Sequence, residues 1–167
     1  MAEKDVDPFL TKKWNHVFNT FFDINGSEML EWNDFEVLIN RISVLRRSGP
    51  KEIEANTTAL KAIWDGLANF ADLDRDNVVS LAEWNEMWTA CVRNQKFPKW
   101  QETYLEYTFK LLDSCADGLI DCSEYVEIMM MYGIDERNAE EAFGKFAMST
   151  DRKAPGNYLF GIISESE

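Results

Sequence analysis

The sequence is poor in histidine and cysteine, and it has far fewer basic than acidic residues. A single histidine, His16, in 167 residues excludes most zinc sites and catalytic pairs built on imidazole. The three cysteines, Cys91, Cys115 and Cys122, form no disulfide framework, which favours reduced thiols in a cytoplasmic protein. Thirty acidic against seventeen basic residues give a net charge of −13. This balance argues against nucleic acid as a partner and favours the binding of cations.

Long apolar runs are also lacking. No stretch approaches the roughly 18 residues that a membrane-spanning helix requires, so we expect no transmembrane segment. Residues 1–5 show neither an apolar signal segment nor the Met-Gly start of a myristoylated protein, which again predicts a cytoplasmic location. Hydrophobic residues nevertheless make up 46% of the chain, enough for a folded core.

Residues 72–83 have the ligand spacing of an EF-hand calcium loop. Oxygen-bearing side chains stand at positions 1, 3, 5, 9 and 12 of this window, and a hard cation needs six to eight oxygens. The expected ligands are Asp72, Asp74, Asp76, the carbonyl of Val78, Ser80 and Glu83. Asn77 at position 6 tolerates the positive φ required there, and Val79 at position 8 predicts a short strand. The alternative is an acidic surface turn.

Residues 23–34 follow the same pattern less closely. The expected ligands are Asp23, Asn25, Ser27, the carbonyl of Met29 and Asp34. Glu28 stands where glycine is preferred, and Asp34 has a shorter side chain than the usual glutamate. We expect a weak or Mg²⁺-preferring site. The alternative is a loop that has lost its metal but still pairs with its neighbour.

Residues 113–124 form the third such window. The expected ligands are Asp113, Cys115, Asp117, the carbonyl of Leu119 and Glu124, with Asp121 at position 9. Gly118 suits position 6, but the Cys115 thiol is a soft ligand that Ca²⁺ does not favour. We therefore expect a calcium site of lowered affinity. A zinc pair of Cys115 and Cys122 has the wrong spacing and no nearby histidine.

Helical hydrophobic patterns flank all three windows, so the sequence predicts an all-α fold of repeated helix–loop–helix units. We expect an N-terminal EF-hand pair at 9–95, a C-terminal lobe at 98–150 and a tail at 151–167, in a compact two-lobe arrangement. Residues 149–161 contain no ligand spacing, so the fourth hand is expected to be degenerate. Ile120 is then expected to lack its usual partner strand.

Four segments carry a resemblance to a known family. They are residues 17–21 (VFNTF), 31–36 (EWNDFE), 63–67 (IWDGL) and 156–161 (GNYLFG). These segments resemble the calexcitin and invertebrate sarcoplasmic calcium-binding protein family. The resemblance implies a four-EF-hand fold with three metal-binding loops. Between Phe146 and Asp151 this chain lacks roughly twenty residues of the fourth loop and its exit helix, so it is expected to be a shortened variant.

Two classes of function follow. The first is a calcium buffer or a calcium sensor, and a sensor exposes a methionine-rich groove to a target protein when calcium binds. Met129, Met130 and Met131 could line such a groove, although ordinary core methionine is the more frequent role. The second class is a photoprotein-like cofactor carrier or a GTP-binding protein. The sequence has no phosphate-binding G-x-x-x-x-G-K-[ST] loop and no nucleophile–base pair, so we expect no enzyme.

Overall fold

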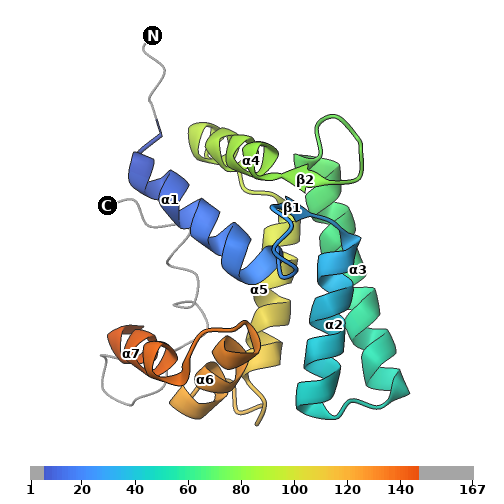
Figure 1. The fold of residues 1–167 in the computed structure, drawn as a ribbon, viewed down its shortest axis with the longest axis vertical. Coiled ribbons are helices and arrows are strands. Elements are labelled where there is room, and N and C mark those ends of the chain that lie inside the picture. Colours follow the sequence, from blue (N-terminus) through green and yellow to red (C-terminus); the bar gives the residue numbers. More distant parts are fainter. Residues whose placement is uncertain (1–5, 147–167) are drawn as a thin grey trace. The chain divides into compact units, whose positions relative to one another are not determined.

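The computed structural model describes residues 6–146, which fall in two compact units, 1–104 and 105–167 (Figure 1). The described part of the first unit contains α1 (Pro8–Val17), the π-helix η1 (Phe18–Phe22), β1 (Met29–Leu30), α2 (Trp32–Arg46), α3 (Pro50–Ala71), β2 (Val79–Ser80), α4 (Leu81–Asn94) and the start of α5 (Lys99–Leu112). The second contains the end of α5, α6 (Cys122–Met131) and α7 (Glu136–Phe146). The predicted all-α fold is confirmed, and a small sheet of β1 and β2 joins two of the predicted loops.

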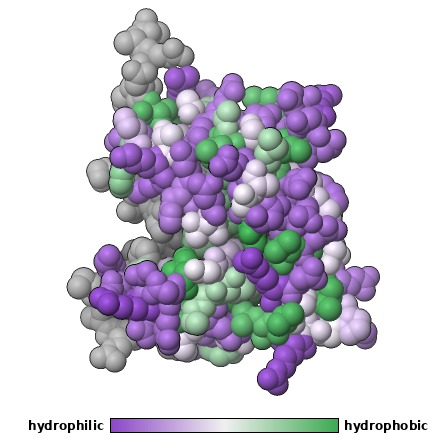
Figure 2. Space-filling view, in the orientation of Figure 1, coloured by the Kyte–Doolittle hydropathy of each residue, from purple (hydrophilic) through white to green (hydrophobic). Residues whose placement is uncertain are grey.

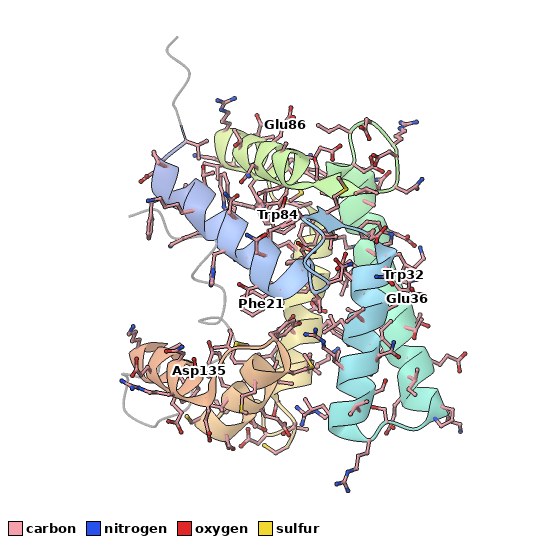
Figure 3. All side chains as sticks on the ribbon, viewed as in Figure 1. Phe21, Trp32, Glu36, Trp84, Glu86 and Asp135 are labelled. Carbon is pink, nitrogen blue, oxygen red and sulfur yellow. The ribbon has the colours of Figure 1, made fainter. Side chains whose placement is uncertain are left out.

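Side-chain caps and left-handed residues fix the helix ends. Asp7 precedes Pro8, and its carboxylate accepts the N–H of Phe9 at 2.8 Å at the start of α1. Asp135, labelled in Figure 3, accepts the N–H of Asn138 at 3.0 Å at the start of α7. Arg47 ends α2 in the left-handed region, with φ at 50°. The helix boundaries therefore follow local hydrogen bonding as well as the apolar pattern.

A buried aromatic cluster forms the core of the first unit. Its members are Trp14, Phe18, Phe22, Trp84, Trp88, Trp100 and Tyr104. Trp84, labelled in Figure 3, is fully buried, and its indole N–H donates to the carbonyl oxygen of Trp14 at 3.0 Å. This bond joins α1 to α4 across 70 residues of sequence. The cluster thereby joins the helix that enters the first loop to the helix that leaves the second.

The last turn before the first loop is a π-helix where the sequence pattern predicts continuous α-helix. The N–H of Asp23 donates to the carbonyl oxygen of Phe18 at 2.9 Å, five residues back. The wider turn places both Phe18 and Phe22 in the core. Such π-turns are frequent at functional sites, and this one ends where the loop begins.

Gly66 permits a close approach between α3 and α5. A Cβ atom at Gly66 would lie 2.8 Å from the Cβ of Trp100, closer than packed carbon atoms allow. The glycine of the IWDGL segment therefore has a packing role, and it brings Trp100 into the aromatic cluster.

The second unit packs α6 against α7. The ring of Tyr125 on α6 lies 5.6 Å from the ring of Phe143 on α7. Met129 is 3% exposed whereas Met130 is 51% exposed, so the methionine run is divided between core and surface. Figure 2 shows a largely hydrophilic face on which hydrophobic side chains are scattered. No helix among residues 6–146 is long and apolar enough to cross a membrane.

Candidate metal centres

The first two loops are joined by the short sheet. Leu30 of β1 pairs with Val79 of β2 in antiparallel register, and Met29 pairs with Ser80. Leu30 and Val79 are both fully buried. Position 8 of each loop therefore forms the strand that the sequence predicts, and the two loops are mechanically connected.

The carboxylate at position 1 organises each loop in the same way. One of its oxygens accepts the N–H of position 5 and the other accepts the N–H of position 6. For Asp23 the donors are Ser27 and Glu28, both at 2.9 Å; for Asp72 they are Asp76 at 3.2 Å and Asn77 at 3.0 Å; for Asp113 they are Asp117 at 3.1 Å and Gly118 at 3.0 Å. A carboxylate has about four lone-pair sites, so each of these groups keeps capacity for a cation.

This hydrogen bonding requires two left-handed residues in every loop. Position 6 has φ of 63° at Glu28, 67° at Asn77 and 81° at Gly118, as the sequence predicts. Position 4 is also left-handed, with φ of 73° at Gly26, 62° at Arg75 and 56° at Ala116. Sequence reasoning missed the requirement at position 4, and Gly26 was the only available signal.

The carboxylate at position 12 closes each loop from the other side. One oxygen accepts an N–H near the start of the loop, and the other accepts the N–H of position 9. Asp34 accepts the N–H of Asn25 at 3.2 Å and the N–H of Glu31 at 3.0 Å. Glu83 accepts the N–H of Leu73 at 3.0 Å and the N–H of Ser80 at 2.9 Å. Glu124 accepts the N–H groups of Cys115 and Asp121, both at 3.0 Å. We call this pair of bonds the clasp. It holds the position-12 carboxylate beside the ligands of positions 1 and 3.

Loop 72–83 has the most carboxylates of the three loops at positions 1, 3, 5 and 12. Carboxylate oxygens of Asp72, Asp74 and Asp76 lie within 4.8 Å of one another. The pKa of Asp74 is raised: the N–H of Asp76 lowers it, but desolvation and the charges of Asp76, Glu83 and Asp72 outweigh that bond. A bound cation would relieve this repulsion. Along the chain, Val78 and Ser80 lie between these carboxylates and Glu83, at positions 7 and 9, where the sequence predicts ligands.

The protein stabilises the charged form of Glu83. Desolvation alone would raise its pKa, but hydrogen bonds from Ser80, Leu73 and Asp74 lower it. The hydroxyl of Ser80 also donates to Glu83 at 2.8 Å. The position-12 carboxylate is therefore ionised and oriented before any ion arrives.

Loop 23–34 has only two carboxylates at positions 1, 3, 5 and 12, and both are buried. Asp23 is 5% exposed and Asp34 is 1% exposed. The pKa of Asp34 is raised, chiefly by burial, with hydrogen bonds from Glu31 and Asn25 opposing the shift. The hydroxyl of Ser27 donates to the carbonyl oxygen of Met29 at 2.7 Å. Two expected ligands are thus bonded to each other in a tightly closed loop.

Loop 113–124 brings Asp113, Cys115 and Asp117 together within 4.8 Å. The thiol of Cys115 lies 3.8 Å from Oδ1 of Asp113 and is exposed to solvent. The pKa of Cys115 is raised: the Asp117 N–H lowers it, but desolvation, the Glu124 hydrogen bond and the charges of Asp117 and Glu124 prevail. Leu119 takes position 7, where its N–H donates to Asp117 at 2.9 Å.

Several other sequence predictions have clear outcomes. Ile120 is fully buried and forms a β-bridge, so the expected loss of its partner is not confirmed. The segment 149–161, where the sequence predicts that the fourth loop is missing, lies outside the described residues. His16 is exposed on α1, and its ring nitrogen lies 3.4 Å from the Thr20 hydroxyl.

Comparisons with known proteins give a consistent family. No family model matches the chain. Calexcitin-1 of Caenorhabditis elegans is 33% identical, with 95% of this chain and 89% of that protein covered. Sarcoplasmic calcium-binding proteins I, III and IV of Branchiostoma lanceolatum are 27% identical over 72% of this chain and 68% of theirs. The calexcitin alignment extends over 183 positions, more than the 167 residues of this chain, so it includes gaps on this chain's side.

Solved structures show the same fold. An amphioxus sarcoplasmic calcium-binding protein superposes with a TM-score of 0.80 at 19% identity, covering 96% of this chain and 92% of its own. Calcium-loaded apo-aequorin from Aequorea victoria has a TM-score of 0.66 at 15% identity, covering 96% and 93%. The chain belongs to the calexcitin and sarcoplasmic calcium-binding protein family.

Proposed function

We propose that this protein binds Ca²⁺ at loops 72–83 and 113–124 and acts through that binding rather than through catalysis. The observation that carries the proposal is the hydrogen-bond framework repeated in all three loops. In each, backbone N–H groups hold the carboxylates of positions 1 and 12 at the inside of a turn. Relatives named as calcium-binding proteins support the choice of cation.

Loop 72–83 is proposed as the tightest site because it has the most negative ligand set. Asp72, Asp74, Asp76 and Glu83 supply four carboxylates, and calcium affinity rises with ligand charge and loop rigidity. The carbonyl of Val78 and the hydroxyl of Ser80 complete the proposed oxygen set. Ca²⁺ would remove the mutual repulsion that raises the pKa of Asp74.

Loop 23–34 is proposed as a Mg²⁺-preferring site. At positions 1, 3, 5 and 12 it offers two carboxylates, from Asp23 and Asp34, where loop 72–83 offers four. Mg²⁺ is smaller, keeps several waters and is usually held by one or two carboxylates. The short side chain of Asp34 and the burial of both acids support a small cation over a large one.

Between buffer and sensor, the second unit favours the buffer. Met129 lies in the core, so the methionine run does not form one continuous apolar face. A target protein of the Ca²⁺-loaded state would be supported if an apolar fluorescent probe bound only when Ca²⁺ was present. Free thiols at all three cysteines support a reducing, cytoplasmic location.

One cavity among the described residues is too small for an organic cofactor. The cavity beside the aromatic cluster has a volume of about 10 Å³, which is room for roughly one water molecule. Its lining consists of Phe21, Phe22, Ile24, Asp34, Phe35, Leu38 and Tyr104. A coloured or fluorescent ligand in the purified protein would reverse this conclusion.

The deciding experiment is a calorimetric Ca²⁺ titration of the metal-free protein, with and without millimolar Mg²⁺. We expect at least two Ca²⁺ sites, and we expect Mg²⁺ to abolish the heat of one weak site only. The Asp23→Asn variant should lose that Mg²⁺-sensitive heat and keep the other sites. No Ca²⁺ heat at any loop would refute the proposal.

A further inference from the structure

We propose that one end of the first unit is a docking surface for an acidic segment of a partner protein. We call this surface the basic end. It consists of residues 8–13 of α1 and residues 92–99, which run from the last turn of α4 to the start of α5. The proposal goes beyond the binding of ions, because this surface contains none of the three loops.

The charge of the basic end is opposite to that of the whole chain. The chain has 30 acidic residues and a net charge of −13, yet residues 8–22 and 87–101 contain no acid. The charged residues of these two stretches are Lys12, Lys13, Arg93, Lys96 and Lys99. Asp7, which precedes them, uses its carboxylate to accept the Phe9 N–H at 2.8 Å. A positive patch on a negative protein is complementary to an acidic partner.

Contacts in the core bring the two stretches together. Nδ2 of Asn85 donates to Oδ1 of Asn15 at 2.8 Å, and the ring of Trp14 lies 6.4 Å from the ring of Trp88. These contacts make α1 and α4 antiparallel, so the start of α1 lies beside the end of α4, as Figure 1 shows. The ring of Trp100 lies 6.0 Å from that of Trp88, which keeps the start of α5 near the same end.

Apolar side chains are exposed among these basic groups. Phe9 is 59% exposed, Val92 is 36% exposed and Phe97 is 47% exposed. The ammonium group of Lys13 lies 4.7 Å from the centroid of the Phe9 ring, so a positive charge and an aromatic side chain lie side by side. Aromatic side chains contribute much of the binding energy of protein interfaces. The basic end therefore offers apolar contacts as well as charge.

An acidic protein segment fits this surface better than a membrane or a second copy of the chain. An anionic membrane extends beyond the patch, so it would also repel the rest of a protein whose net charge is −13. Two copies related by a two-fold axis would bring like charges together at this surface. A peptide segment can contact the basic end alone, with carboxylates beside the lysines and apolar side chains beside Phe9 and Phe97.

The corner between α2 and α3 provides an internal reference. Residues 37–51 also contain no acid, and they include the exposed Arg47 and Lys51. Val44 in this stretch is 80% exposed, but the stretch contains no aromatic residue. The corner therefore resembles the basic end in charge and lacks its aromatic surface, so we expect it not to hold the acidic segment.

The test uses a fluorescein-labelled peptide with glutamate and leucine at helical spacing, titrated with the full-length protein in metal-free buffer at low salt. We expect saturable binding by fluorescence anisotropy, and we expect added salt to weaken it. The double variant Lys12→Glu, Lys96→Glu should weaken binding at least about tenfold. The matched control Arg47→Glu, Lys51→Glu changes the net charge equally and should keep the affinity within about twofold.

A second pair of variants tests the apolar contact. Phe9→Ala should weaken peptide binding about fivefold, because it removes apolar surface that the peptide would cover. Val44→Ala, at the reference corner, should leave the affinity unchanged. These variants change exposed side chains outside the loops, so their Ca²⁺ titrations should match that of the wild type and report on the proposed function separately.

Three results would overturn the proposal. The first is the absence of saturable peptide binding by the wild type. The second is equal weakening by the two double variants, because net charge alone would then explain the binding. The third is tighter binding to vesicles of phosphatidylserine and phosphatidylcholine than to the peptide, which would make this end a membrane-binding surface.

Discussion

Replacing Glu83 by glutamine tests whether the clasp both stabilises the loop and binds the cation. Oε1 of Glu83 accepts the Leu73 N–H at 3.0 Å, and Oε2 accepts the N–H and hydroxyl of Ser80 at 2.9 and 2.8 Å. Glutamine offers one acceptor oxygen and one NH₂ group, so the NH₂ group would meet a backbone N–H on one side of the clasp and that hydrogen bond would be lost. Hydrogen bonds to a charged group contribute about 1.5–3 kcal/mol. Because Glu83 is partly solvated, we expect a loss of about 1–2 kcal/mol in metal-free stability.

The same substitution should weaken calcium binding more strongly. It removes one negative charge and one of the two oxygens that would face the ion. Truncating one partner of a close charge pair costs about 2–5 kcal/mol, so we expect Ca²⁺ affinity at this site to fall about 100-fold or more. The assays are urea unfolding without metal and calorimetric Ca²⁺ titration.

The control for both assays is Glu86→Gln. Glu86 is an exposed glutamate of α4, one turn after Glu83 and labelled in Figure 3. The Glu86→Gln substitution removes the same charge without changing the clasp, so the metal-free stability and the Ca²⁺ affinity should both stay near the wild-type values. Equal effects of the two variants would refute the reasoning, because overall charge would then explain the result. Unchanged Ca²⁺ affinity in Glu83→Gln would show that Glu83 is no ligand.

Three further predictions concern packing, strain and pH. Gly66→Ala should destabilise the protein by about 1 kcal/mol in urea unfolding. The clash with Trp100 costs about 1–3 kcal/mol, which exceeds the gain in helix propensity of about 1 kcal/mol. Gly144→Ala is the control: open space surrounds Gly144, so this variant should stabilise the protein in the same assay. Glu28→Gly should relieve the strain of a φ of 63° and raise the free energy of unfolding by about 0.5 kcal/mol. Relief of the left-handed penalty contributes about 1–2 kcal/mol, but the greater flexibility of glycine in the unfolded chain removes part of that gain. A lower urea midpoint would contradict this prediction. The pKa values of Glu83 and Glu124 in the folded protein lie below the ordinary 4.5. The unfolded chain therefore binds more protons, and the stability that these two groups contribute is lost as pH falls below about 4.5. Glu83→Gln should weaken the dependence of the unfolding free energy on pH in this acid range, and an unchanged dependence would contradict the prediction.

The three loops and their helices could be predicted because their signals are local. Ligand spacing at positions 1, 3, 5 and 12 and apolar helical periodicity lie within short windows. The pairing of Leu30 with Val79 also followed, since position 8 is apolar in both loops. The left-handed φ of Asn77 and Glu28 followed from the turn that the spacing requires.

Features that depend on distant contacts were not predictable. The role of Gly66 depends on Trp100, which lies 34 residues later in sequence. The π-helix at 18–22 depends on burying Phe18 and Phe22 in one core, a requirement that periodicity alone does not reveal. The left-handed Arg75 and Ala116 gave no signal, because neither residue type favours that conformation.

The structure separates the residues that hold each loop together from the residues that we propose determine its ion preference. In all three loops position 1 accepts the N–H groups of positions 5 and 6, and position 12 accepts the N–H of position 9 and one N–H near the start of the loop, so the framework is shared although the side chains at positions 3 and 5 differ. Positions 3 and 5 differ: Asp74 and Asp76 in one loop, Asn25 and Ser27 in another, and Cys115 with Asp117 in the third. Because these side chains lie inside a common framework, one architecture can offer a highly charged oxygen site, a weakly charged oxygen site and a mixed oxygen–sulfur site. Ion preference can therefore change by substitution at position 3 without refolding the loop.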